Sequence, residues 1–279
     1  MVHRAVALWE QPRAGLILRM CSNYLPVTSA QRLLTFFGVE YAKDEISTYE
    51  GTFPLGMAPF IRLTVEGQEG GRPALLAEDG MFGLLPQFAT ELQYGRRTYN
   101  CRSETVHKLN SFRPSWNAGQ RCVIPADAVF EPNYETGKSV RWRITREGNV
   151  PWGIAGVYRR WKNPDGSGAP LFTFTMLTVN CDTHPFYKRF HKPNDEKRMP
   201  IFLEREQYIP WLTCSVDDAS LFFKQHPGPF VGEAAPLARA PKLVGDPLKG
   251  EELLPPKPAA LPKTSKASKP KPPEQGELF

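Results

Sequence analysis

Long apolar runs are missing from this chain of 279 residues. No apolar stretch reaches the roughly 18 residues that a membrane-spanning helix needs. The longest apolar run near the start, Gly15 to Leu18, is also too short for the core of a secretion signal. We therefore expect a protein of the cytoplasm with no membrane partner.

Cysteine pairs and metal-ligand spacings are missing as well. The chain has five cysteines, with no C-x-x-C pair and no histidine at ligand spacing beside any of them. This pattern argues against a disulfide scaffold or a zinc site, and we expect neither a metal nor a cofactor. Four of the cysteines are expected to be small buried residues in a reducing compartment, namely Cys101, Cys122, Cys181 and Cys214.

A strong charge of one sign is also absent from the body of the chain. Lys and Arg number 35 against 29 Asp and Glu, which gives a formal charge of +6. Residues 253–273 hold seven prolines, five lysines and no acidic residue, and they contribute +5. Residues 1–20 contribute +2, so the remaining body is near −1. A body that binds an anionic partner must therefore gather its cations in one groove.

The 28 prolines argue against an all-helical bundle, because each proline removes a backbone donor and breaks a helix interior. Runs rich in β-branched and aromatic residues, bounded by turn formers, predict short strands at 60–65, 74–77, 122–124, 129–130, 140–145, 153–158, 171–179 and 199–203. We expect a single α+β domain built on a curled, mainly antiparallel sheet or open barrel.

Short helices are expected at the edges of this sheet. Thr28 or Ser29 can cap a helix that runs through Phe37 and closes at Gly38. Polar caps and breakers predict further short helices at 103–109, 204–212 and 216–224.

The C-terminal region changes in composition from about residue 240. Residues 240–273 read as an extended, disordered linker rich in Pro and Lys. The chain then ends on two large apolar residues, Leu278 and Phe279, which follow Gln275 at the spacing Gln-x-x-Leu-Phe. This ending resembles the peptide that bacterial replication and repair proteins insert into the sliding clamp. The alternative is an arbitrary tail.

Met20 and Cys21 read like a translation start whose methionine can be removed. Residues 1–20 would then be a mis-assigned upstream extension or a removed propeptide. Processing would give Cys21 a free α-amine, whose ordinary pKa of about 7.7 to 8.0 leaves far more of it neutral at pH 7 than of a lysine at about 10.4. Such an amine can condense with an aldehyde to a Schiff base, which the adjacent thiol can close into a thiazolidine.

Four segments occur in the order typical of one family. They are Met20-Cys21-Ser22-Asn23-Tyr24, residues 99–105 (YNCRSET), residues 121–131 (RCVIPADAVFE), and Arg189-Phe190-His191 followed by Arg198-Met199-Pro200-Ile201. Together they resemble the SRAP family (SOS response-associated peptidase, the abasic-site processing proteins), over about Cys21 to Pro229. The resemblance implies covalent capture of the ring-opened aldehyde of an abasic site in single-stranded DNA.

The resemblance also implies roles for individual residues. Cys21 would be the nucleophile, Asn100 would orient its amine, and Glu131 and His191 would move the protons. His184 is the rival of His191, which is preferred because Phe190-His191 precedes the Arg-Met-Pro strand. Apolar neighbours of Glu131 would desolvate its carboxyl, as expected for a group that both takes and returns a proton.

DNA contacts are expected from residues in or near the same segments. Arg102 is the foremost candidate, and Arg97, Glu104 and Arg198 complete the expected set. The resemblance further implies lyase cleavage through the Schiff base, self-removal of the segment before Cys21, and a role in the DNA damage (SOS) response. We expect a monomer that is associated with the nucleoid of a bacterium.

Three departures from the family pattern concern the surroundings of the site. Asn23 stands where the family usually has an arginine two residues after the cysteine. Phe82-Gly83 replaces a Trp-Gly. Six residues, 192–197, separate His191 from Arg198 where one is usual, so we expect an enlarged loop beside the site.

Two other functions are compatible with these residues. One is a cysteine peptidase or N-terminal-nucleophile hydrolase that acts on proteins through Cys21, His191 and Asn100. The other is a non-catalytic DNA-binding adaptor in which Cys21 is inert.

Overall fold

The computed structural model describes residues 23–41, 51–64 and 74–237. These residues all belong to one compact unit that ends at Leu237. Cys21, the upstream residues 1–20, the linker 240–273 and the terminal peptide lie outside the described residues. The expectations for them stay predictions.

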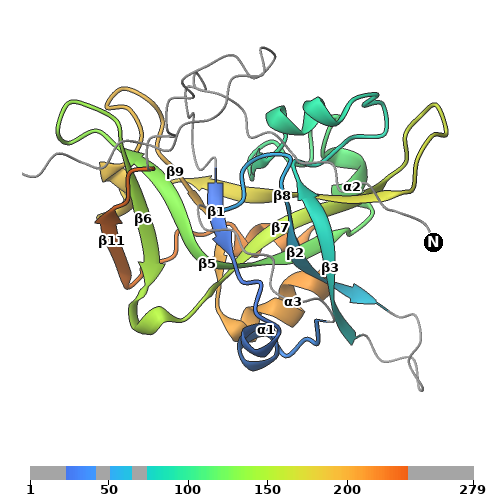
Figure 1. The fold of residues 1–279 in the computed structure, drawn as a ribbon, viewed down its shortest axis with the longest axis horizontal. Coiled ribbons are helices and arrows are strands. Elements are labelled where there is room, and N and C mark those ends of the chain that lie inside the picture. Colours follow the sequence, from blue (N-terminus) through green and yellow to red (C-terminus); the bar gives the residue numbers. More distant parts are fainter. Residues whose placement is uncertain (1–22, 42–50, 65–73, 238–279) are drawn as a thin grey trace, which may run out of the picture. The chain divides into compact units, whose positions relative to one another are not determined.

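In the part of the chain that the structure describes, eleven strands form one curled sheet (Figure 1). The strands are β1 (Asn23–Pro26), β2 (Met57–Thr64), β3 (Ala74–Phe82), β4 (Asn100–Arg102), β5 (Arg121–Asn133), β6 (Val140–Arg146), β7 (Trp152–Trp161), β8 (Leu171–Asn180), β9 (Arg198–Pro200), β10 (Phe202–Leu203) and β11 (Phe230–Ala234). Most pairings are antiparallel, while β3 and β4 pair with β8 in parallel. The sheet is curled, and the expected α+β class is confirmed.

Strand β5 is the centre of the sheet because it changes partners along its length. Its first half, Arg121 to Ala126, pairs with β7. Its second half, Val129 to Asn133, pairs with β6 on one side, and β1 runs antiparallel to it on the other. Figure 1 shows β1, in blue, beside β5. The start of β1 is thereby held next to the end of β5 that carries Glu131.

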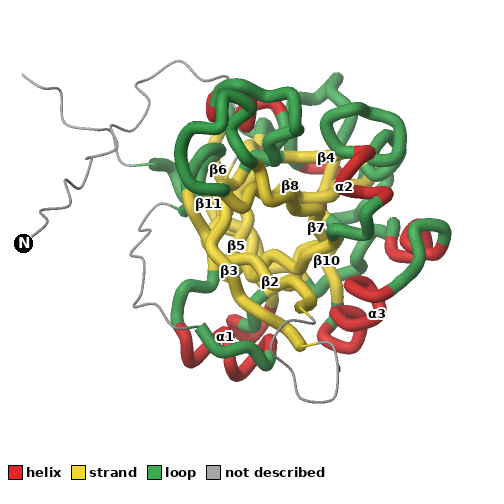
Figure 2. Tube along the Cα trace, turned by 90° about the vertical axis from the view of Figure 1, so that its right-hand side faces the viewer, coloured by secondary structure: helices red, strands yellow, loops and turns green. Residues whose placement is uncertain are grey.

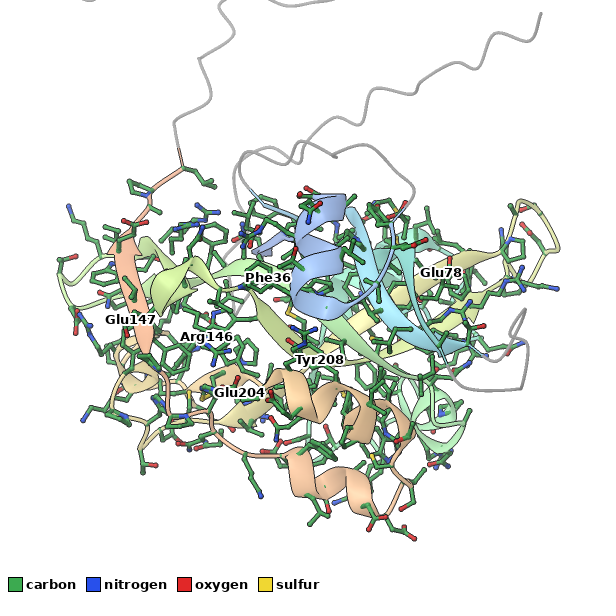
Figure 3. All side chains as sticks on the ribbon, turned by 90° about the horizontal axis from the view of Figure 1, so that it is seen from below. Phe36, Glu78, Arg146, Glu147, Glu204 and Tyr208 are labelled. Atoms are coloured by element: carbon green, nitrogen blue, oxygen red, sulfur yellow. The ribbon has the colours of Figure 1, made fainter. Side chains whose placement is uncertain are left out.

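Short helices lie around the outside of the strands (Figure 2). The α-helices are α1 (Ala30–Phe37), α2 (Arg113–Asn117) and α3 (Tyr208–Thr213). The 3-10 helices are η1 (Leu92–Arg97), η2 (Glu147–Asn149), η3 (Tyr187–Arg189), η4 (Arg205–Gln207) and η5 (Asp218–Phe222). Tyr208 of α3 stacks on Phe37 of α1 with ring centroids 5.5 Å apart, and Figure 3 shows Tyr208 between these two helices.

The local helix signals in the first segment are confirmed. Ser29 accepts a hydrogen bond from the backbone N–H of Arg32, and Gly38 closes α1 in the left-handed region at φ 69°. One face of α1 is buried and carries Leu33 and Phe37. A cap at each end and one apolar face are sufficient to define a short helix against a sheet.

The helix predicted at 103–109 is wrong, because this segment forms successive turns. The backbone N–H of Ser103 donates to the carbonyl oxygen of Thr178, which continues the pairing of β4 with β8. Pairing with the sheet thus holds the start of the segment in an extended form. The described fold also continues past Pro229, where strand β11 pairs with the edge of β6.

The core combines aromatic rings and aliphatic side chains from β5, β7 and β8 with those of α1, α3 and the connecting segments. Within the described residues, no helix is long and apolar enough to cross a membrane.

Candidate functional site

Glu131 and His191 form a buried pair at the end of β5. The distance from His191 Nε2 to Glu131 Oε2 is 3.6 Å, and the two side chains are 4% and 0% exposed. His191 Nε2 lies 2.9 Å from the carbonyl oxygen of Arg198, so in the neutral ring this nitrogen carries the hydrogen and donates it. Two candidates that are 60 positions apart in the chain therefore meet side by side.

The backbone of His191 is held in an unusual conformation. Its φ is 65°, in the left-handed region that a non-glycine residue seldom adopts. Its N–H donates to the carbonyl oxygen of Pro132 at 2.7 Å, and the preceding Phe190 forms an isolated bridge with Asn133. These contacts with the end of β5 aim the imidazole at Glu131.

His184, the rival candidate, has a different position. Its Nδ1 accepts hydrogen bonds from the backbone N–H groups of Phe186 and Tyr187, at 3.1 and 3.0 Å. Its Nε2 lies 2.9 Å from the carbonyl oxygen of His226. These contacts give His184 a structural place in the turn before η3, and His191 is the histidine beside Glu131.

Asn100 begins β4, next to a chain of packed rings that leads to β1. Tyr99 contacts Phe82 edge to face with centroids 5.7 Å apart, and Phe82 contacts Tyr24 at 5.2 Å. Phe82 is fully buried, so the residue that replaces the usual tryptophan is a core ring here. It packs between the segment that carries Asn100 and strand β1, which begins two residues after Cys21 in sequence.

An arginine occupies the neighbourhood of Asn23, although not at the expected position in the sequence. Arg141 of β6 donates from Nε to the side-chain oxygen of Asn23 at 3.5 Å. Its guanidinium lies 3.4 Å from the ring centroid of Phe130. Arg141 could not be identified from the sequence, because only the register of β5 with β6 places it beside Asn23.

Arg198 is the buried centre of a network of charges. Its guanidinium donates to both oxygens of Glu104, at 3.0 and 2.8 Å, to Glu196 at 2.7 Å, and to the carbonyl oxygen of Thr178 at 2.6 Å. Although burial opposes the shift, its two carboxylate partners raise the pKa of Arg198. The Arg198 side chain is only 2% exposed and is therefore embedded in the protein.

Arg102 is the more accessible of the two arginines. Its side chain is 49% exposed, and Nη1 lies 2.8 Å from Glu196 Oε2. Arg97, at the end of η1, is exposed. Phe82 and Trp116 are buried, so neither ring can stack on a base, whereas Phe88 is 56% exposed and contacts Tyr94 edge to face.

Three of the four described cysteines are buried as expected. All four are free thiols; Cys101, Cys122 and Cys181 are buried, whereas Cys214 is half-buried. Burial raises the pKa of the Cys181 thiol, and the charge of Glu131 raises it further. Within the described ranges no group of three or more His, Cys, Asp or Glu side chains could hold a metal ion.

The sequence pattern of the SOS response associated peptidase family matches residues 20–245. The chain belongs to the SRAP family. Among its relatives, the abasic site processing protein YoqW of Bacillus subtilis is 31% identical over 137 residues, which is 47% of this chain and 54% of that protein. The abasic site processing protein HMCES of Gallus gallus is 27% identical over 158 residues, which is 48% of this chain and 44% of that protein. The chain thus spans about half the length of the curated relatives it matches.

Two solved structures share the fold of this SRAP member. A Bordetella bronchiseptica protein has a TM-score of 0.68 at 32% identity, covering 78% of this chain and 100% of that one. A Bacteroides thetaiotaomicron protein has a TM-score of 0.52 at 21% identity, over 64% of this chain and 74% of that one. The second likeness concerns the fold alone.

Proposed function

We propose that this protein captures abasic sites in single-stranded DNA as a covalent thiazolidine, formed by Cys21 after its α-amine has been exposed. The observation that carries the proposal is the buried contact between Glu131 and His191, at 3.6 Å. Family membership and the names of the relatives supply the class of substrate.

The described strands support a place for Cys21 beside this pair. Asn23 is the register partner of Phe130, the residue before Glu131. Cys21 lies two residues before Asn23, so their Cα atoms are at most about 7.6 Å apart. A nucleophile at position 21 is therefore tethered close to the end of β5.

Capture takes place in two stages, condensation to a Schiff base and closure of the thiazolidine ring, and protons must move in both. The Cys21 amine adds to the C1′ aldehyde, and the adduct loses its hydroxyl as water to give a Schiff base. The thiol then adds to the imine carbon, and its proton ends on the nitrogen of the thiazolidine. Glu131 and His191 would accept the amine proton and deliver one to the departing hydroxyl, while Asn100 would orient the amine.

The test uses protein whose N-terminus is confirmed as Cys21 by intact mass, mixed with single-stranded DNA that holds one abasic site. We expect a band that survives a denaturing gel without borohydride. The matched variant C21S keeps the amine and loses the thiol, so its crosslink should need borohydride trapping. Absence of any covalent band from the unmodified protein would refute the proposal.

Glu131→Gln probes the proton-transfer step separately. Because Gln keeps the size of the side chain and cannot take a proton, we expect crosslinking to slow by about 10²-fold or more. DNA strand cleavage at the abasic site, measured on the same gels, tests the lyase activity. Release of residues 1–20 from full-length protein, and its loss in C21A, tests self-processing.

The two alternatives predict different results. A peptidase that acts on other proteins would cleave supplied peptides, whereas we expect cleavage only of the protein's own chain. A DNA-binding adaptor would retain abasic DNA equally well after C21A. We expect C21A to remove the covalent fraction that survives a denaturing gel without borohydride.

We further propose that the terminal peptide docks on a sliding clamp through Gln275, Leu278 and Phe279. The support is the sequence alone: two large apolar residues follow a polar tract that offers them no core. Binding of a purified clamp to the full chain, compared with L278A/F279A, tests this. Equal binding by both would exclude the docking role.

A further inference from the structure

We infer that Glu196 competes with DNA phosphate for Arg102. In the free protein the Glu196 carboxylate is paired with the Arg102 guanidinium, and DNA phosphate displaces it on binding. The inference rests on the proposed function, because it concerns the DNA contact of the same site. Glu196 belongs to the loop that separates His191 from Arg198.

Arg102 is positioned to meet a strand of DNA held at the site. It follows Asn100 by two residues on β4, and alternate residues of a strand face the same side. The side chain is 49% exposed, so its guanidinium reaches solvent. A phosphate near Asn100 would therefore find this cation on the same face of the strand.

Glu196 already holds that cation. Glu196 Oε2 lies 2.8 Å from Arg102 Nη1, while Oε1 accepts from Arg198 Nη1 at 2.7 Å and from Asn180 Nδ2 at 3.3 Å. Although partial burial opposes it, the hydrogen bonds from Arg198 and Asn180 lower the pKa of Glu196 below its ordinary value. The carboxylate stays ionised at neutral pH and bridges a buried arginine to an exposed one.

The two arginines differ in what they can exchange. Arg198 is embedded and also bound to Glu104 and to the carbonyl oxygen of Thr178, so phosphate cannot replace its partners without opening the fold. Arg102 is bound to Glu196 near the surface, where ion pairs contribute little and reform readily. Carboxylate and phosphate oxygens also make the same kind of contact with a guanidinium. Arg102 is therefore the arginine that can exchange its carboxylate partner for a phosphate.

The charges of this cluster cancel before DNA arrives. Arg102 and Arg198 carry two positive charges, and Glu104 and Glu196 carry two negative ones. Binding of phosphate by Arg102 must displace Glu196, which lowers the affinity for DNA of any sequence. Undamaged DNA then dissociates readily, while an abasic site is retained by the covalent bond.

The test measures binding of a fluorescent, undamaged single-stranded oligonucleotide, which offers no aldehyde, to the full chain. E196Q keeps the size of the side chain and removes its charge. We expect it to bind about two- to fivefold more tightly at low salt. We also expect the slope of log affinity against log salt to steepen by about 0.7, the value of one released counterion on a single strand. E206Q makes the same change of charge in η4 and measures the effect of net charge alone.

The double variant R102Q/E196Q decides whether Glu196 acts through Arg102. In the R102Q background, E196Q should have no effect beyond that of E206Q. An undiminished gain in that background, or no gain in E196Q alone, would overturn the inference even if the protein crosslinks abasic DNA. If the unmodified protein neither binds nor crosslinks DNA, the proposed function fails and the inference fails with it.

Discussion

Arg198→Lys should destabilise the protein, because a lysine cannot reproduce the forked contacts of this buried guanidinium. Arg198 makes four short contacts, two with Glu104, one with Glu196 and one with the carbonyl oxygen of Thr178, between 2.6 and 3.0 Å. The single ammonium group of a lysine, at the end of an unbranched stem, can keep about two of these contacts. Hydrogen bonds to charged groups contribute about 1.5 to 3 kcal/mol each when buried.

The exposure of the partners reduces this figure. The side chain of Glu104 is 51% exposed and that of Glu196 is 33% exposed, so solvent screens both ion pairs. Taking about 1 kcal/mol for each lost contact, with some strain for the misplaced charge, we expect a loss of about 2 to 3 kcal/mol. With a urea dependence of about 3 kcal/mol per molar, the unfolding midpoint falls by about 0.7 to 1 M.

Urea unfolding followed by tryptophan fluorescence measures this shift. Arg143→Lys is the matched control, because Arg143 forms an ion pair with the exposed edge residue Glu233, at 3.4 Å. That change should stay within about 0.5 kcal/mol. A shift for Arg198→Lys no larger than that of the control would refute the argument that the network holds β9 and the turns after β4 together.

Three further predictions concern the histidine, the interface of α3 with the sheet, and pH. His191→Asn should keep the fold, because Asn tolerates the left-handed φ of 65°, yet it should slow crosslinking by about 10²-fold or more; equal rates would exclude the imidazole. Gly153→Ala would bring its Cβ to 2.6 Å from Tyr208 Cζ, so a melting curve should show a loss of about 2 kcal/mol, and an unchanged midpoint would contradict the packing. Although burial opposes it, hydrogen bonds from Arg198 lower the pKa of Glu104 below 4.5; its stabilisation is therefore complete above pH 4.5 and is lost as the pH falls through the lowered pKa. In a plot of the unfolding midpoint against pH, Glu104→Gln should flatten this fall at acid pH.

Elements defined by local signals were predictable from the sequence. Helix α1 depends on Ser29 and Gly38, which satisfy the backbone at either end whatever lies further along the chain. Most strands were found from their β-branched and aromatic runs. The two runs at 122–124 and 129–130 belong to one strand, β5, although Pro125 lies between them. β5 changes partner soon after this proline, from β7 to β6, so the pattern of a single strand is interrupted without the strand ending.

Elements that depend on distant pairing were missed. Strand β4 has three residues, and its parallel pairing with β8 gives no local pattern. The turns after Ser103 were predicted to be helical because propensity alone does not include the bond from Ser103 to Thr178. The order of motifs located Glu131 and His191, and their contact follows from the fold. Glu196 could not be chosen from the sequence, because its role depends on the path of the loop between His191 and Arg198.

The same network changes the interpretation of the charge of the body. A basic groove was expected, yet Arg102, which is proposed for DNA contact, meets Glu196, and Arg189 beside His191 in sequence meets Glu135. Hydrogen bonds from Arg189 and Asn133 lower the pKa of Glu135 to about 2, so this carboxylate is ionised throughout the neutral range. An arginine that exchanges a carboxylate for a phosphate releases little net counterion, because the freed carboxylate must be neutralised again. The salt dependence of DNA binding should therefore be shallower than about 0.7 per contacting arginine, and under the proposed function the lifetime of the complex would come from the covalent bond.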